Sequence, residues 1–193
     1  MESRAGPFLT LDSQVGYNLS SQSENRSLSS RRVLRRLVPA FSPKELEGDT
    51  SAAGLRFAVL CARWNPTVTE ALLQAALRTL SRRGARAADV TVVRVPGAFE
   101  LPAAARALVE KGRTDALVAL GAIVRGQTTH YEVLGHAVAT ALAGLSAYTG
   151  LPIGFGVLTC DTMEQARERS GKGAEAAEAA IEMANLRRRI RRR

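Results

Sequence analysis

One of the two histidines in the sequence, His130, follows residues that could bind an anion. Gly126, Gln127 and Thr128 lead into a run with helical character, and the first backbone N–H groups of a helix have no partner within it. Such amides can bind a phosphate group. The positive end of the same helix disfavours protonation of His130, which keeps the imidazole able to accept a proton near pH 7. We therefore predict a phosphate site beside a proton-transfer residue; the alternative is that His130 only packs or caps the helix.

Three more segments that follow apolar runs contain side chains suited to a ligand. They hold the only tryptophan, Trp64, the pair Phe99 and Glu100, and the pair Asp161 and Thr162. Ligands of parallel α/β sheets gather at the carboxyl ends of the strands. The combination predicts an aromatic pocket for a flat ring beside the anion site.

The elements that must position these residues follow an alternating pattern from Leu55 onward. Short continuous apolar runs alternate with longer Ala-rich runs of helical period, a pattern typical of βαβ units. The run at residues 115–124 is apolar on both faces, which favours the centre of a parallel sheet. We predict a three-layer α/β/α sandwich with a four-stranded parallel sheet. The strands are expected at residues 55–61, 90–95, 115–124 and 152–160, and the helices at residues 67–84, 101–111, 130–150 and from residue 163 onward.

The formal net charge of +9 is concentrated near the C-terminus. Residues 187–193 hold six arginines, two thirds of the excess, whereas residues 55–186 are nearly neutral. A nearly neutral domain does not suit a nucleic-acid groove, so only the arginine-rich segment is a candidate for binding a polyanion. Its alternative is a solvated helix end with favourable charges for the helix dipole. No apolar run approaches the roughly 18 to 20 residues that span a bilayer.

A change in composition near residue 54 divides the chain into three expected parts. Residues 1–54 are Ser-rich with no sustained period and are expected to be a mobile extension. An organelle transit peptide and a translated upstream region are the alternatives for this part. Residues 55–186 are expected to form one domain, and residues 187–193 an arginine-rich tail. We expect a cytoplasmic protein, unless residues 1–54 direct it to an organelle.

The cysteines and histidines predict no metal site. Cys61 and Cys160 follow apolar runs without metal-ligand spacing and are expected to be buried free thiols, rather than a disulfide or a metal site. His136 lies about 240° around a helix from His130, so the two histidines cannot share a metal. We expect His136 to be an ordinary histidine on a helix face.

Five segments between residues 55 and 186 are similar to motifs of a known protein family. They are LRFAVLCARWN, RVPGAFELP, GAIVRGQTTHYE, FGVLTCDT and AAIEMANL. Their order and approximate spacing resemble those of the lumazine synthases. The resemblance implies a flavodoxin-like sandwich that forms pentamers and sometimes sixty-subunit capsids. It implies condensation of 5-amino-6-(D-ribitylamino)uracil with 3,4-dihydroxy-2-butanone 4-phosphate in riboflavin biosynthesis, without a metal or redox cofactor, and makes riboflavin synthase a candidate partner.

The resemblance also implies roles for individual residues. The pyrimidine substrate would lie against an aromatic ring and a strand end, with a carboxylate accepting from its ribityl hydroxyls; the matching residues are Trp64, Asn65, Ala98, Phe99, Glu100, Leu101, Ala122, Ile123 and Val124. The phosphate would be held by Gly126, Gln127, Thr128, Arg169 and Lys172. His130 matches the catalytic histidine. Phe155 matches an aromatic that a neighbouring subunit contributes, so the active site would exist only in the oligomer.

The sequence departs from the family pattern at two places. Thr129 replaces the proline that commonly precedes the catalytic histidine, which leaves the turn less rigidly preset. The loop between Arg169 and Lys172 is shorter than usual, which is expected to weaken phosphate binding or reshape a subunit contact.

Three other functions are alternatives. The first is a non-catalytic shell that binds polyanions through the arginines, and the second is an archaeal-type riboflavin synthase. The third is an FMN carrier, which the sequence fits less well because no hydroxyl-rich loop follows the first strand.

Overall fold

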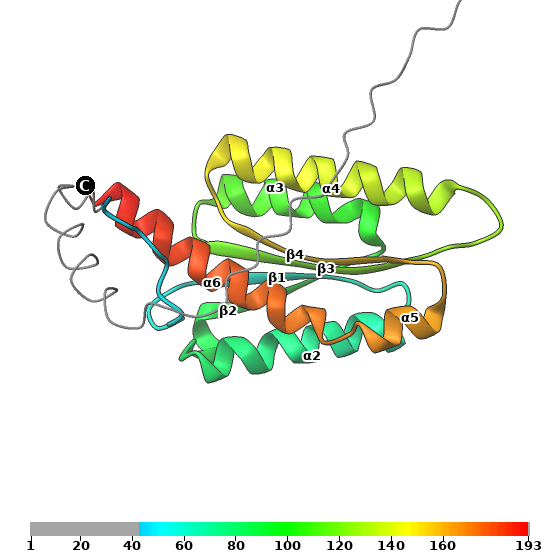
Figure 1. The fold of residues 1–193 in the computed structure, drawn as a ribbon, viewed down its shortest axis with the longest axis horizontal. Coiled ribbons are helices and arrows are strands. Elements are labelled where there is room, and N and C mark those ends of the chain that lie inside the picture. Colours follow the sequence, from blue (N-terminus) through cyan, green and yellow to red (C-terminus); the bar gives the residue numbers. More distant parts are fainter. Residues whose placement is uncertain (1–42, 193) are drawn as a thin grey trace, which may run out of the picture. The chain divides into compact units, whose positions relative to one another are not determined.

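The computed structural model describes residues 43–192, in which strands and helices alternate (Figure 1). The strands are β1 (Phe57–Ala62), β2 (Val90–Val95), β3 (Ala116–Val124) and β4 (Ile153–Cys160). The helices are α2 (Pro66–Arg82), α3 (Leu101–Lys111), α4 (His130–Thr149), α5 (Met163–Glu168) and α6 (Lys172–Arg191), with short 3-10 helices η1 (Ala87–Asp89) and η2 (Ala98–Glu100). No helix in the described range combines the length and the apolar content needed to cross a membrane.

The four strands form one parallel sheet in the order β2-β1-β3-β4. Every residue of β1 is buried, and in β3 only Val124 is partly exposed. The continuous apolar sequences of these central strands arise because helices cover both of their faces. The strand order reverses between β1 and β3, and such a switch point opens a crevice at the carboxyl ends of the two strands. The predicted α/β sandwich with a four-stranded parallel sheet is confirmed.

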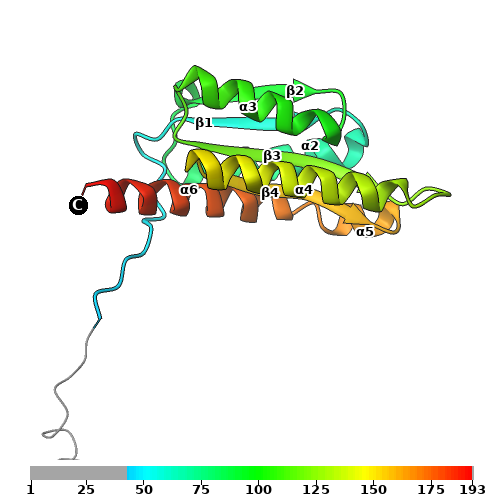
Figure 2. The same ribbon diagram turned by 90° about the horizontal axis from the view of Figure 1, so that it is seen from above.

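Helices cover the two faces of the sheet in two groups. α2, α5 and α6 lie on one face, and α3 and α4 lie on the other (Figure 1). Figure 2 shows α3 beside β1 and β2, and α4 beside β3 and β4. Alternate strand residues enter separate apolar clusters: Val59 packs on the α2 and α6 side, whereas Leu60 packs on the α3 and α4 side. The sheet therefore has a core on each face.

α6 approaches β4 closely because glycine and alanine form the contact. A Cβ atom at Gly154 would lie 1.9 Å from the carbonyl oxygen of Ala176, in the backbone of α6. No side chain fits at that position without moving the helix. Ala176 and Ala180, both buried, continue the small-residue contact along α6.

Replacing Gly154 by alanine should therefore destabilise the fold. The added methyl group meets backbone rather than a flexible side chain, and overpacking of this kind costs about 1–3 kcal/mol. Gly171→Ala is the matched control, because Gly171 has a helical φ of −63° and no atom within 4 Å of the added Cβ. Urea unfolding measures both free energies. A Gly154→Ala protein as stable as Gly171→Ala would contradict the close contact.

The C-terminal helical region differs from the prediction of one continuous helix from residue 163. Residues 169–171 interrupt it, so that α5 ends at Glu168 and α6 starts at Lys172. Thr162 caps α5 by accepting from the Gln165 amide at 3.2 Å. Ser170 and Gly171, which lie in the break, are poorer helix formers than alanine.

The segment before Leu55 is attached to the rest of the compact unit that spans Glu45–Arg193. Asn185 of α6 secures the preceding segment: its side-chain amide donates to the carbonyl oxygens of Asp49 at 2.7 Å and Ser51 at 2.8 Å. These polar contacts leave no apolar pattern in the sequence, so the sequence did not predict them. The rest of the expected extension, residues 1–42, lies outside the described residues.

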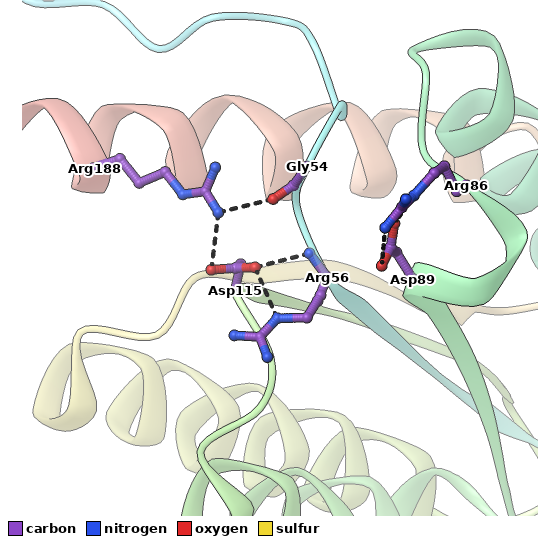
Figure 3. Close-up of polar contacts among 6 residues, drawn as sticks. All are labelled: Gly54, Arg56, Arg86, Asp89, Asp115 and Arg188. Carbon is purple, nitrogen blue, oxygen red and sulfur yellow. Dashed lines mark hydrogen bonds and ion pairs between the residues drawn. The ribbon is translucent and has the colours of Figure 1, made fainter.

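Most of the arginine-rich segment lies in α6, which ends at Arg191. Arg188 donates to the carbonyl oxygen of Gly54 at 3.0 Å and pairs with Asp115 at 3.2 Å (Figure 3). Asp115 also lies 3.5 Å from the Nε atom of Arg56. Part of the C-terminal positive charge therefore stabilises the junction between α6 and the sheet.

Both cysteines are buried, as predicted. Cys61 lies in β1, where desolvation by burial raises the pKa of its thiol. Cys160 ends β4, and burial raises the pKa of its thiol as well. Because a thiolate is the reactive form of cysteine, these two side chains act as small apolar groups at neutral pH.

Candidate active site

A hollow of about 260 Å³ opens at the carboxyl ends of β1 and β3. This is the switch point of the sheet, where the chain leaves the two central strands towards opposite faces. Nine of the predicted site residues line the hollow. They are Trp64, Asn65, Ala98, Ala122, Ile123, Val124, Gly126, Thr128 and His130.

Asn65 joins the ends of the two central strands. Its Nδ2 atom donates to the carbonyl oxygen of Ala122 at 2.8 Å. Its φ of 58° is in the left-handed region, the only such non-glycine case among residues 43–192. Asparagine tolerates this conformation better than most residues do. Pro66 then starts α2 with its fixed φ. Asn65 therefore stands at the N-cap of α2 and also joins the two walls of the pocket.

Two substitutions at Asn65 should separate its side-chain and backbone roles. Asn65→Ala and Asn65→Gly both remove the bond to Ala122, but only alanine is strained at φ 58°. We expect the alanine variant to be less stable than the glycine variant by about 1 kcal/mol. Chemical denaturation measures the difference, and equal stabilities would show that the backbone does not hold this conformation.

Trp64 presents an indole face beside the turn that follows β2. Its backbone amide donates to the carbonyl oxygen of Pro96 at 3.1 Å. A Cβ atom at Gly97 would lie 2.6 Å from Cε3 of Trp64, so Gly97 is needed to leave room for the ring. The indole is 64% exposed and can receive a flat ligand. Gly97 was not among the predicted site residues, although it stands inside the RVPGAFELP segment.

Among the predicted residues of η2 and the start of α3, only Ala98 lines the hollow. Glu100 Oε2 accepts from the Gly97 amide at 2.8 Å, which fixes the direction of the carboxylate. Phe99 is 63% exposed and does not line the hollow. Leu101 is fully buried, so its side chain belongs to the core.

The turn between β3 and α4 offers backbone donors next to an imidazole. Within residues 43–192, the amides of Gly126, Gln127 and Thr128 donate to no carbonyl or side chain. The Thr128 hydroxyl accepts from the backbone amide of His130 at 3.4 Å. His130 is the first residue of α4 and is exposed in the hollow. An anion bound to this turn would lie next to a group that can transfer protons.

Three predicted residues lie away from the hollow. Arg169 donates to the carbonyl oxygen of Gln165 at 3.3 Å, and Lys172 pairs with Glu175 at 2.7 Å. Phe155 is paired with Ala119, in the middle of β3, and lines a different hollow against α4. A single chain therefore does not bring Arg169, Lys172 or Phe155 to the pocket.

Tyr131 and Leu134 line the hollow but were not predicted. They follow His130 by one and four positions on the same helix, so helical spacing from His130 was the available signal for Leu134. The Tyr131 hydroxyl donates to Glu132 at 2.9 Å, and this bond raises the pKa of Tyr131. The guanidinium carbon of Arg125 lies 5.7 Å from the centre of the Tyr131 ring.

The side chains around the hollow can stack on a ring, bind an anion and transfer protons. His136 is exposed on α4 and does not line the hollow. Between residues 43 and 192, no three His, Cys, Asp or Glu side chains come together in a way that could hold a metal ion.

Two comparisons with known proteins agree with this geometry. The sequence profile of the 6,7-dimethyl-8-ribityllumazine synthases matches residues 54–188. The chain is also similar to the curated 6,7-dimethyl-8-ribityllumazine synthase of Desulfotalea psychrophila, with 47% identity over 149 residues. That alignment covers 75% of this chain and 96% of the relative. The chain therefore belongs to the 6,7-dimethyl-8-ribityllumazine synthase family.

Proposed function

We propose that this chain is a transferase of riboflavin biosynthesis. It condenses 5-amino-6-(D-ribitylamino)uracil with 3,4-dihydroxy-2-butanone 4-phosphate to 6,7-dimethyl-8-ribityllumazine, and releases phosphate and water. Family membership supports this reaction. The observation that carries it is the meeting of His130, the unpaired amides of residues 126–128 and the face of Trp64 at one hollow.

Each step of the reaction needs protons to be moved while the two substrates are held against each other. One pyrimidine amine condenses with the carbonyl of the sugar phosphate and a water leaves, phosphate is then eliminated, and the second amine closes the ring with loss of a second water. Holding both substrates in place can contribute about 7–11 kcal/mol, and one acid–base residue typically adds about 10²–10⁴ in rate. We assign the proton transfers to His130, which is exposed in the hollow beside the anion-binding turn.

The pyrimidine substrate would lie between β1 and β3. Its ring would stack on Trp64 and contact the end of β3 at residues 122–124, while Asn65 holds these two walls together. The ribityl chain would follow residues 98–101, where the Glu100 carboxylate can accept from its hydroxyls. For Leu101 the contact would come from the backbone, since its side chain is buried.

The phosphate would be bound by the amides of Gly126, Gln127 and Thr128. Arg169 and Lys172 would add positive charge from the junction of α5 and α6. Both side chains are exposed and held by single contacts within the helical segment, so a bound phosphate can compete for them.

We also propose that the enzyme works as an oligomer, and specifically as a pentamer. α4 contains one charged residue, Glu132, in its 20 residues, and only Val138 and Leu142 of that helix are buried. Phe155 is 48% exposed beside it. An uncharged helix face of this size suits contact with a second copy, whose pocket Phe155 would complete. Light scattering would distinguish a pentamer from a sixty-subunit capsid.

A non-catalytic shell that binds polyanions through its arginines is not favoured. The chain matches an enzyme family along residues 54–188. Arg188 and Arg189 are engaged within the fold, with Asp115 and with the carbonyl oxygens of Gly54 and Glu47.

Incubating the full-length protein with both substrates tests the proposed reaction. We expect the fluorescence of the lumazine to rise faster than in the same mixture without protein, and not to rise when either substrate is omitted. A rate equal to that of the mixture without protein would contradict the proposal.

A further inference from the structure

The hollow lacks a positive side chain in its own wall. None of the described residues that line it is an arginine or a lysine, although the proposed substrate carries a phosphate. Arg169 and Lys172 lie outside it and bond to Gln165 and Glu175. Phosphate groups are bound most strongly through charge-assisted hydrogen bonds. Another cation near the turn would supply the missing charge.

Arg125 is placed to supply that charge. It stands between Val124 and Gly126, which both line the hollow, and its amide donates to the carbonyl oxygen of Cys160 at 2.9 Å. Its guanidinium lies over the ring of Tyr131, another lining residue, at 5.7 Å. The backbone of Arg125 is therefore fixed at the wall of the hollow. Its guanidinium lies next to Tyr131, whose side chain lines the hollow.

The only ion pair of Arg125 in the described part of the chain is weak. Its Nη1 atom lies 3.4 Å from Asp161, and the two side chains are 58% and 59% exposed. Exposed pairs of this kind contribute little, so exchanging Asp161 for a phosphate costs little. A guanidinium can also give a phosphate two parallel hydrogen bonds, which an ammonium cannot.

We propose that Arg125 is a phosphate-binding residue for the sugar-phosphate substrate. Its guanidinium leaves Asp161 and bonds to the phosphate that the amides of residues 126–128 hold. The assignment rests on the proposed function and adds a cation from the wall of the same subunit to those of the α5–α6 junction.

The test compares two arginine variants in the full-length protein. Arg125→Gln should raise KM for the sugar phosphate roughly tenfold, the effect of losing a charge-assisted hydrogen bond, and leave KM for the pyrimidine within about twofold. Arg106→Gln is the matched control, because Arg106 is 57% exposed on α3 and also pairs with a carboxylate, Glu110. Equal KM values for the sugar phosphate in the two variants would overturn the proposal.

A binding measurement separates this proposal from the proposed reaction. Calorimetric titration with inorganic phosphate should show binding roughly tenfold weaker for Arg125→Gln than for wild type and Arg106→Gln. Equal affinities, or no binding by any of the three proteins, would contradict a role for Arg125. If wild type forms lumazine while Arg125→Gln binds phosphate normally, only the assignment of Arg125 fails. If wild type forms none, the proposed reaction fails, and the phosphate titration still decides on Arg125.

Discussion

Replacing His130 by alanine should lower kcat by about 100-fold or more and leave measurable product formation. General acid–base catalysis contributes about 10²–10⁴ in rate, and that contribution is lost with the imidazole. In the proposed binding mode the two substrates lie at Trp64 and at the turn before α4, so positioning should continue to accelerate the reaction without His130. Steady-state kinetics with both substrates varied gives kcat and each KM.

His136→Ala is the matched control for this experiment. His136 is the other histidine of α4, and it is exposed away from the hollow. We expect kcat for His136→Ala to equal that of wild type. A His130→Ala protein with the same kcat as His136→Ala would remove His130 from the mechanism.

Phe155→Ala should lower kcat/KM on the order of 30-fold, the effect of losing about 2 kcal/mol of aromatic contact with the substrate ring. The reason is that Phe155 would cover the pyrimidine in a neighbouring subunit. Within its own chain it sits opposite Ala119, well before the end of β3 where the hollow opens. Steady-state kinetics should show the loss, and size measurement must show that the variant still assembles.

Co-assembly of two impaired variants tests whether the pocket is shared. His130→Ala and Phe155→Ala chains are each expected to be impaired alone. In a mixed ring, about a quarter of the sites would combine an intact His130 from one chain with an intact Phe155 from the next. Co-expressed chains should therefore recover activity that a mixture of the separately assembled variants lacks. Equal activity of the two preparations would contradict a site shared between subunits.

The strands and most helices could be predicted because their apolar patterns differ clearly. The strands β1 and β3 are continuous apolar runs, as the centre of a parallel sheet requires. The break between α5 and α6 was missed because the signal for it is short. Only Ser170 and Gly171 interrupt an otherwise helical composition. The attachment of residues 45–54 was missed because it depends on Asn185, which is distant in sequence.

The pocket was predictable to the extent that it consists of strand ends. Parallel strands bring Asn65, Ala122 and the turn before His130 to one edge of the sheet, so their neighbourhood follows from topology. Arg125 was not predicted as a site residue because its relation to Tyr131 depends on side-chain placement. Phe155 and Arg169 lie away from the hollow in a single chain, so in the proposed function their contact with a substrate would depend on assembly and on ligand binding.

The stoichiometry of the reaction tests the central claim most directly. Purified full-length protein is incubated with the ribitylamino-uracil and the sugar phosphate, and both 6,7-dimethyl-8-ribityllumazine and inorganic phosphate are quantified over time. We predict that the two products form at equal rates, in proportion to protein concentration, and that His130→Ala slows both equally. Phosphate release without lumazine, or product formation that does not depend on protein concentration, would contradict the assignment of this chain as a lumazine-forming transferase.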